Sequence, residues 1–183
     1  VSSLEGYLYP DTYYFDVKAG LRSILTTLVD RFKSVYYDSL NGESRLDSTE
    51  LSRHELITLA SIVEGEVMLE SERRIVAGIY YNRLKKRMYL QACPTIQYII
   101  EDSPRRLLDK HLEIDSPYNT YKHYGLPPGP VNNPGRKSIE AVLNPADTDY
   151  LYLVAAGDGT HTFSKTLSEH NRAKAEFNKN HRK

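Results

Sequence analysis

The sequence predicts an α+β domain made of mixed helices, a small antiparallel sheet and a long loop rich in proline and tyrosine. Apolar residues at helical spacing predict the helices, a strand–turn–strand pattern near the C-terminus predicts the sheet, and a proline-rich stretch predicts the loop. The 183 residues suffice for one sizeable domain and contain no internal repeat. Residues 1–183 are therefore expected to form a single unit.

Helical periodicity is clearest in the first half of the chain. Residues 21–35 place leucine, isoleucine, phenylalanine and valine on one face, which predicts an amphipathic helix, and the polar residues 38–48 predict a loop after it. The next helix is expected to begin at Ser52, because Glu55 completes a capping box with it, and to run to about Val67.

The middle of the chain is less regular. A third helix is expected from Ser71 to about Met88, followed by a short β-prone run, Thr95–Ile100. Residues 101–135 contain six prolines and are expected to form a long loop, with one or two helical turns at Arg105–Leu112.

The last part of the chain predicts a helix, a hairpin and a second helix. Asn133-Pro134 suits the cap and first turn of a short helix, Gly135–Leu143. Tyr150–Ala155 and His161–Phe163 predict two strands joined by a Gly-Asp-Gly turn. The Thr-x-x-Glu pattern at 166–169 is typical of the capping box of a helix, and a basic helix is expected after it.

Composition excludes several classes of protein. The 24 Lys and Arg balance the 24 Asp and Glu, so no nucleic-acid partner is expected. No apolar run approaches the roughly 20 residues of a membrane-spanning helix. The six histidines lack metal-ligand spacing and no phosphate-cradling glycine loop occurs, so neither a metal nor a cofactor is expected. The single cysteine, Cys93, is expected to be a buried, inert thiol.

Carboxylates remain as carriers of chemistry, and the helix after Ser52 holds Glu64 and Glu66. Two positions apart, they point to roughly opposite sides of a helix. Each has apolar neighbours, which raise the pKa of a carboxyl because its charged form loses hydration, and a general acid needs that shift. Helical position alone does not choose between the two, and it leaves open that either ends in water at the helix edge.

Nine runs of sequence, spread over nearly the whole chain, carry a family resemblance. They are Leu4–Tyr13, Leu59-Ala-Ser-Ile-Val-Glu-Gly-Glu66, Val76–Leu84, Met88–Tyr98, Ser116-Pro-Tyr-Asn-Thr-Tyr121, Gly125-Leu-Pro-Pro-Gly-Pro130, Asn144-Pro145, Tyr150–Ala155 and His161–Asn171. Together and in this order they resemble the endolytic murein transglycosylases of the YceG-like family. One such run is weak evidence, whereas nine in register are highly specific.

The resemblance implies a bacterial enzyme that cleaves the β-1,4 bond between N-acetylmuramic acid and N-acetylglucosamine without water. The cut falls within the peptidoglycan strand and leaves a 1,6-anhydromuramoyl end. In the family the catalytic glutamate is the first one of the Ser-Ile-Val-Glu run, which is Glu64 here. A single carboxyl suffices, because it can protonate the leaving oxygen and then, as a carboxylate, deprotonate the substrate's own C6 hydroxyl.

Five further residues in the matching runs are expected to bind substrate and stabilise the oxocarbenium-like charge, although a structural role stays open for each. They are Gln91, Thr95, Tyr118, Asn119 and Tyr121. A cleft walled by residues 91–98 and 116–129, with Glu64 at its floor, is the expected arrangement. The chain departs from the family at Cys93, where Asp is frequent; activity is altered if that Asp assists catalysis or fixes the loop, and little changes if it only caps a turn.

The resemblance also implies a setting for the protein. Family members carry an N-terminal membrane anchor and a small LysM-like domain, so residues 1–183 are expected to be the catalytic domain, without the anchor and without most or all of the LysM-like domain. The expected location is the extracytoplasmic face of the bacterial inner membrane, where the parent protein is held by a single membrane span. The expected partners are peptidoglycan glycan strands and the cell-wall synthesis machinery, since the family terminates growing strands.

Three other functions stay open. A hydrolytic muramidase would leave a reducing end instead of an anhydro end. A non-catalytic peptidoglycan-binding module would grip sugar with the tyrosine-rich loop and use Glu64 structurally. An aminodeoxychorismate lyase, an older label for the family, would require pyridoxal phosphate, and the chain lacks a phosphate-cradling motif.

Overall fold

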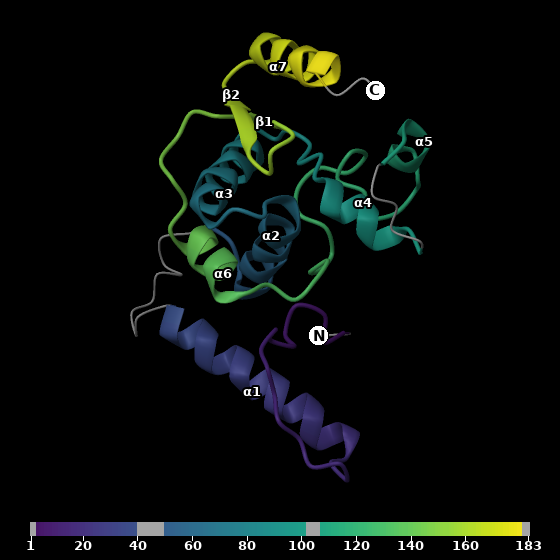
Figure 1. The fold of residues 1–183 in the computed structure, drawn as a ribbon, viewed down its shortest axis with the longest axis vertical. Coiled ribbons are helices and arrows are strands. Elements are labelled where there is room, and N and C mark those ends of the chain that lie inside the picture. Colours follow the sequence, from purple (N-terminus) through teal and green to yellow (C-terminus); the bar gives the residue numbers. More distant parts are fainter. Residues whose placement is uncertain (1–2, 40–49, 102–106, 181–183) are drawn as a thin grey trace.

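The computed structural model describes residues 3–39, 50–101 and 107–180, and these residues form helices with one small antiparallel sheet (Figure 1). The predicted α+β class is confirmed. In chain order the elements are α1 (Leu21–Ser39), α2 (Arg53–Glu66), α3 (Glu70–Lys85), α4 (Cys93–Ile99), α5 (Asp109–Leu112), α6 (Arg136–Leu143), β1 (Tyr152–Ala155), β2 (His161–Ser164) and α7 (Leu167–Asn180).

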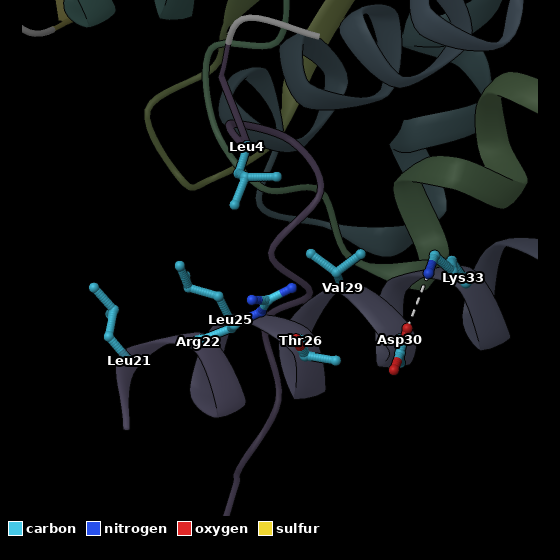
Figure 2. A pocket seen from close by; sticks show the side chains of 8 residues that line it. All are labelled: Leu4, Leu21, Arg22, Leu25, Thr26, Val29, Asp30 and Lys33. Carbon is cyan, nitrogen blue, oxygen red and sulfur yellow. Dashed lines mark hydrogen bonds and ion pairs between the residues drawn. The ribbon is translucent and has the colours of Figure 1, made fainter. Parts of the chain in front are cut away.

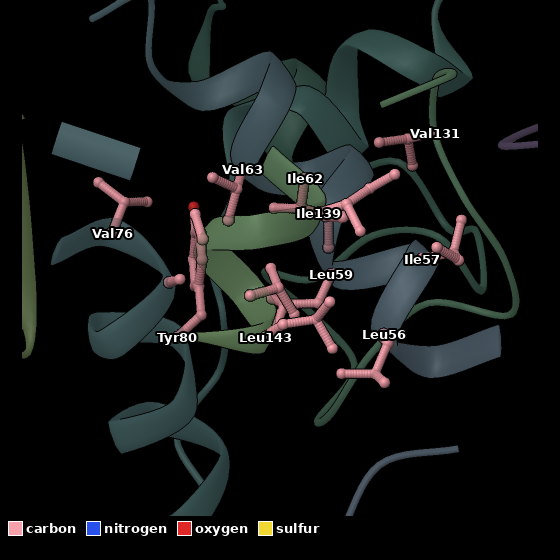
Figure 3. Packing of buried hydrophobic residues seen from close by; sticks show 14 of the residues in the cluster. Leu56, Ile57, Leu59, Ile62, Val63, Val76, Tyr80, Val131, Ile139 and Leu143 are labelled. Atoms are coloured by element: carbon pink, nitrogen blue, oxygen red, sulfur yellow. The ribbon is translucent and has the colours of Figure 1, made fainter. Parts of the chain in front are cut away.

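Helix α2 is the centre of the core and carries both candidate glutamates. Its residues 56–63 are all buried, including the polar Thr58 and Ser61, so this part of the helix is covered on every side. Helices α3, α4 and α6 contact it, and Figure 3 shows Ile139 of α6 and Tyr80 of α3 among its buried leucine, isoleucine and valine side chains. This close packing fixes the backbone that presents Glu64.

Both predicted capping boxes are confirmed. At the start of α2, the backbone N–H of Glu55 donates to Ser52 Oγ over 3.3 Å, and Ser52 N–H donates to Glu55 Oε2 over 2.8 Å. Thr166 and Glu169 exchange the same pair of hydrogen bonds before α7. Each box satisfies backbone donors that the first helical turn leaves free, so it defines where the helix begins.

Helix α1 confirms the first predicted amphipathic helix, and it continues to Ser39. The predicted loop 38–48 therefore begins inside the helix at 38–39, and residues 40–48 lie outside the described ranges. Only the second half of α1 meets the core, through Phe32, Val35 and Tyr36. Its first half borders a surface hollow of about 380 Å³. Figure 2 shows Leu21, Leu25 and Val29 on the side of the helix that faces Leu4 across this hollow.

The prediction of a β-strand at Thr95–Ile100 is wrong, because residues 93–99 form helix α4. Two local features favour a helical start: Pro94 lies in the first turn, where its missing N–H costs nothing, and the Thr95 hydroxyl donates to Ala92 O over 2.8 Å. Pro94, Thr95 and Ile96 are buried, and α4 packs against α2. Tertiary packing thus overrides the β propensity of the threonine and isoleucines.

Two other helix ends differ from the prediction. Helix α3 begins at Glu70 and ends at Lys85 rather than near Met88, because Arg87 has a positive φ of 52° that no helix accommodates. Of the turns expected at Arg105–Leu112, α5 supplies one at Asp109–Leu112, and residues 105–106 lie outside the described ranges.

The cap predicted for α6 is also wrong. Its N-cap residue is Gly135, which has no side chain to cap the helix. Asn133 instead accepts the backbone N–H groups of Gly6 and Leu8, over 2.8 and 3.0 Å, and so ties the N-terminal segment to the loop before α6.

The predicted hairpin is confirmed: β1 and β2 pair antiparallel, with Tyr152 opposite Ser164, and α7 packs on them. The Glu72 carboxylate of α3 anchors the hairpin. One of its oxygens accepts a hydrogen bond from the backbone N–H of His161 over 2.9 Å, and the other lies 2.7 Å from His161 Nδ1. None of the described helices is both long enough and apolar enough to span a membrane.

Candidate active site

Glu64 lies in the last turn of α2, and both of its carboxylate oxygens have partners. Oε1 accepts a hydrogen bond from Arg73 Nη2 of α3 over 3.1 Å, and Oε2 accepts one from the backbone N–H of Gly135 over 3.0 Å. The Glu64 side chain is 28% exposed and that of Arg73 is 15% exposed. The carboxylate is thus accessible, and it sits between a guanidinium and a backbone donor rather than in the apolar surroundings expected from helical position.

Residues 128–135, which we call the strap, run along α2 from its start to its end. Each contact joins a polar atom of the strap to α2, so the two segments are fixed in register. The contacts are His54 Nε2 with Pro128 O at 3.1 Å, Ser61 Oγ with Val131 N at 3.0 Å, Ser61 O with Asn132 Nδ2 at 2.8 Å, and Glu64 Oε2 with Gly135 N at 3.0 Å.

Gly65, between the two glutamates, lets the start of α4 approach α2 closely. A Cβ at this position would lie 2.8 Å from Pro94 Cβ and 3.2 Å from Asn132 Nδ2, which is closer than packing permits. The 91–98 run and the strap therefore meet on the last turn of α2. This explains why two motifs far from Glu64 in sequence gather beside it.

Glu66 points to a different environment. Its carboxylate accepts a hydrogen bond from Tyr80 Oη over 3.1 Å and another from the backbone N–H of Cys93. Part of the residue remains accessible, but the surrounding protein atoms desolvate the carboxyl and raise its pKa above the ordinary value. The two glutamates thus differ in environment. Glu64 forms an ion pair, and Glu66 is enclosed between α3 and α4.

Cys93 lies next to this second glutamate, and its Sγ is 3.4 Å from the Tyr121 hydroxyl. Burial raises the pKa of the thiol, and the charge of Glu66 raises it further, so the thiol stays protonated at neutral pH. An Asp at this position would place a second carboxylate beside Glu66.

Two of the five predicted substrate-binding residues have buried side chains. Thr95 and Asn119 are each 0% exposed. The Thr95 hydroxyl also contacts Thr120 Oγ1 at 2.9 Å, and Asn119 Nδ2 donates to the carbonyls of Leu112 and Ile114. Their hydrogen bonds hold the loop after α5 in shape.

The other three predicted residues are at least partly accessible. Gln91 is exposed, with a positive φ of 49°, and its Oε1 accepts a long hydrogen bond of 3.4 Å from Arg83. Tyr121 is half-buried against Cys93. Tyr118 is half-buried and packs its ring on Tyr98, with centroids 4.9 Å apart.

Residues from the two segments expected to wall a cleft over Glu64 do line a common hollow, but it lies near the start of α2 and Glu64 is not part of it. Tyr98, Tyr118, Pro128 and Gly129 line a hollow of about 320 Å³ beside His54, which we call the His54 hollow. A separate hollow of about 420 Å³ lies between α3 and α6, and Arg73 borders it.

Sequence reasoning missed Arg73 and the strap. Arg73 follows Glu64 by nine residues across the α2–α3 turn, a spacing with no local signature. Residues 128–130 stood out as part of the Gly125–Pro130 run and residues 133–135 as a helix start, but nothing in the sequence predicted that they lie along α2. Within the described ranges, no group of three or more His, Cys, Asp or Glu side chains is arranged to hold a metal ion.

Known proteins resemble this chain over most of its length. The YceG-like family profile matches residues 1–176. An endolytic murein transglycosylase of Bacillus subtilis is 45% identical over 95% of this chain and 48% of its own length, and one of Streptococcus pneumoniae is 36% identical over 94% of this chain and 32% of its own. A crystal structure of a YceG-like protein from Listeria monocytogenes superposes with a TM-score of 0.84 at 43% identity, over 92% of this chain and 55% of that one. The chain spans about half the length of these proteins, or less.

Proposed function

The chain belongs to the YceG-like family, and on this basis we propose that it is the catalytic domain of an endolytic murein transglycosylase with Glu64 as its acid and base. The observation that carries the proposal is the placement of Glu64. It lies at an accessible helix end, with its two carboxylate oxygens held by Arg73 and by Gly135 N–H.

The proposed reaction needs one carboxyl and no water. Protonated Glu64 gives its proton to the glycosidic oxygen as the bond from that oxygen to C1 breaks. The C6 hydroxyl of the same muramic acid unit then attacks C1, and its proton passes to the Glu64 carboxylate. The products are a free hydroxyl on one fragment and a 1,6-anhydro ring on the other, and Glu64 is protonated again.

The contacts of Glu64 suit the second half of this cycle. Arg73 and Gly135 N–H stabilise the carboxylate, which is the form that accepts the C6 hydroxyl proton. Because they come from α3 and from the start of α6, they also fix the direction of the carboxylate before the substrate arrives.

Of the remaining predicted residues, we propose that Gln91, Tyr118 and Tyr121 contact the glycan directly. Their side chains are at least partly accessible, and they lie in the runs that meet α2. Thr95 and Asn119 would act on substrate only through the shape of the loop they hold.

The position of Glu66 removes it as the second carboxyl that a hydrolase would need. Retaining and inverting glycosidases use two carboxyl groups that flank the scissile bond. Glu66 cannot supply the second carboxyl group, because it accepts hydrogen bonds from the Tyr80 hydroxyl and from Cys93 N–H on the other side of α2.

The setting of the protein follows from its family. We propose that the substrate is the peptidoglycan glycan strand, and that the parent protein acts at the extracytoplasmic face of the membrane, held by an anchor. The cell-wall synthesis machinery is the proposed partner.

The test is cleavage of purified glycan strands by the unmodified protein and by a Glu64→Gln variant. Mass spectrometry is expected to find 1,6-anhydro ends, one water lighter than hydrolytic ends, and the variant is expected to lose at least about a hundredfold in rate while still binding glycan. Glu176→Gln, on the exposed surface of α7, is the matched control. Reducing ends, or undiminished cleavage by Glu64→Gln, would overturn the proposal.

A further inference from the structure

One wall of the His54 hollow is aromatic. Tyr98 and Tyr118 pack with ring centroids 4.9 Å apart and planes inclined by 39°, and Tyr98 is 40% exposed. Gly129 leaves room beside them, since a Cβ there would lie 3.3 Å from the Tyr118 hydroxyl and 3.5 Å from His54 Nε2. Tyrosine rings offer an apolar face with a hydroxyl at the edge, which matches the alternating C–H and hydroxyl groups of a sugar ring.

The polar wall of the hollow is rich in hydrogen-bond acceptors. Glu5 lines it, and among the described residues the Glu5 carboxylate has no hydrogen-bond or ion-pair partner. The carboxylate lies close enough to Tyr98 to help raise the pKa of that phenol, after burial and the neighbouring Tyr118. A carboxylate can accept hydrogen bonds from the hydroxyl or amide groups of a ligand.

His54 is held in place by both of its ring nitrogens. Pro128 O can only accept, so Nε2 carries the hydrogen of this 3.1 Å contact, while Nδ1 and the Tyr7 hydroxyl form a hydrogen bond of 2.6 Å. No lysine or arginine of the described ranges lines the hollow, which disfavours phosphate and carboxylate ligands.

The strap links the hollow to Glu64. It begins at Pro128 beside His54 and ends at Gly135 beside Glu64. The two ends of this path are ten residues apart on α2, which corresponds to about 15 Å along the helix axis. A polymer lying along the strap would therefore reach both places at once.

We propose that the His54 hollow is a distal sugar subsite, which binds one N-acetylhexosamine ring of the glycan strand away from the bond that is cut. This inference rests on the proposed function for the identity of the polymer. The aromatic pair takes the face of the ring, and Glu5 accepts hydrogen bonds from its hydroxyl or acetamido groups. The subsite adds binding energy for long strands and leaves the chemistry at Glu64 unchanged.

The first test measures binding without cleavage. The Glu64→Gln protein is titrated with the N-acetylglucosamine tetramer and followed by NMR or calorimetry. Adding Tyr98→Ala is expected to weaken binding roughly tenfold, as loss of an aromatic anchor does. Gly129→Ala, which narrows the hollow at a residue with an ordinary φ, is expected to weaken it as well. Tyr14→Ala, at a tyrosine that is 96% exposed, is the matched control and is expected to bind normally.

The second test measures cleavage with Glu64 intact. Tyr98→Ala is expected to raise KM for long glycan strands several-fold more than it raises KM for the shortest cleavable fragments. Unchanged tetramer binding by both hollow variants would overturn the inference. Binding of free stem peptides at the hollow, in place of the sugar tetramer, would overturn it too. A failure of the proposed function looks different, because Glu64→Gln would then cleave strands as well as the unmodified protein does.

Discussion

Gly135 donates its backbone N–H to Glu64 Oε2 over 3.0 Å and so joins two residues that are 71 positions apart. Gly135 is the N-cap residue of α6, and its N–H has no role within that helix. The contact therefore lets the start of one helix orient the carboxylate at the end of another.

This contact can be removed with a matched pair of substitutions. Gly135 has φ −80°, which both alanine and proline adopt. Gly135→Ala keeps the N–H and places its Cβ 3.5 Å from Glu64 Oε2, an ordinary contact, so cleavage of glycan strands is expected to stay within a few-fold of the unmodified rate. Gly135→Pro removes the donor, and kcat is expected to fall about tenfold or more. Equal rates for the two variants would show that the N–H does not position Glu64.

Arg73 is predicted to be a positioning residue for Glu64. Arg73→Ala is expected to lower kcat by roughly a hundredfold with little change in KM, because the carboxylate loses its charged partner and its direction. Arg73→Lys keeps the charge without the planar fork and is expected to be intermediate. Arg22→Ala, on the exposed face of α1, is the control. If Arg73→Ala changed only thermal stability, the residue would be structural.

The raised pKa of Glu66 is expected to make the free energy of unfolding depend on pH. Burial raises the pKa of its carboxyl in the folded state, so the folded protein holds this proton to a higher pH than the unfolded chain does. Stability is then lost as pH rises from the ordinary carboxyl pKa through the raised one, and the loss persists above it. Glutamine at position 66 cannot ionise. The stability of Glu66→Gln relative to the unmodified protein is therefore expected to increase between about pH 4 and pH 7.

Urea denaturation at both pH values measures this difference, with Glu176→Gln as the control on an exposed helix. A difference between Glu66→Gln and the unmodified protein that does not change with pH would contradict the raised pKa.

Alanine substitutions at three glycines distinguish the energetic cost of backbone strain from that of a steric clash. Gly20 has an ordinary φ, and no heavy atom lies within 4 Å of the position that an alanine Cβ would take, so Gly20→Ala is expected to be neutral or slightly stabilising. Gly125 has φ +84° and open space, and Gly125→Ala is expected to cost about 1 kcal/mol from strain alone. Gly6 has φ +86°, and a Cβ there would lie 2.4 Å from Pro130 Cγ, so Gly6→Ala is expected to cost more than about 2 kcal/mol.

Thermal or chemical denaturation of the three variants measures the order of their stabilities. If Gly6→Ala cost no more than Gly125→Ala, the N-terminal segment would not be packed against the strap as described.

The elements that could be predicted are those whose signals are local. Ser52 and Glu55 are three residues apart, and the hairpin register follows from a short turn, so nearby residues are enough to specify both. Helix α4 was predicted wrongly because its conformation depends on α2: the β-prone Thr95, Ile96 and Ile99 become helical in a segment that packs against α2. The predicted cap of α6 failed for the same reason, since the N-terminal segment takes the Asn133 side chain.

For Glu64, the sequence predicted a carboxylate near the end of a helix, and the family resemblance pointed to Glu64 rather than Glu66 as the catalytic residue. Their different environments come from the fold. Arg73 and Gly135 reach Glu64, whereas Tyr80 and the start of α4 enclose Glu66. Electrostatic and hydrogen-bonding environments are set by atoms within a few ångströms in space, and these atoms come from segments that the sequence does not place side by side.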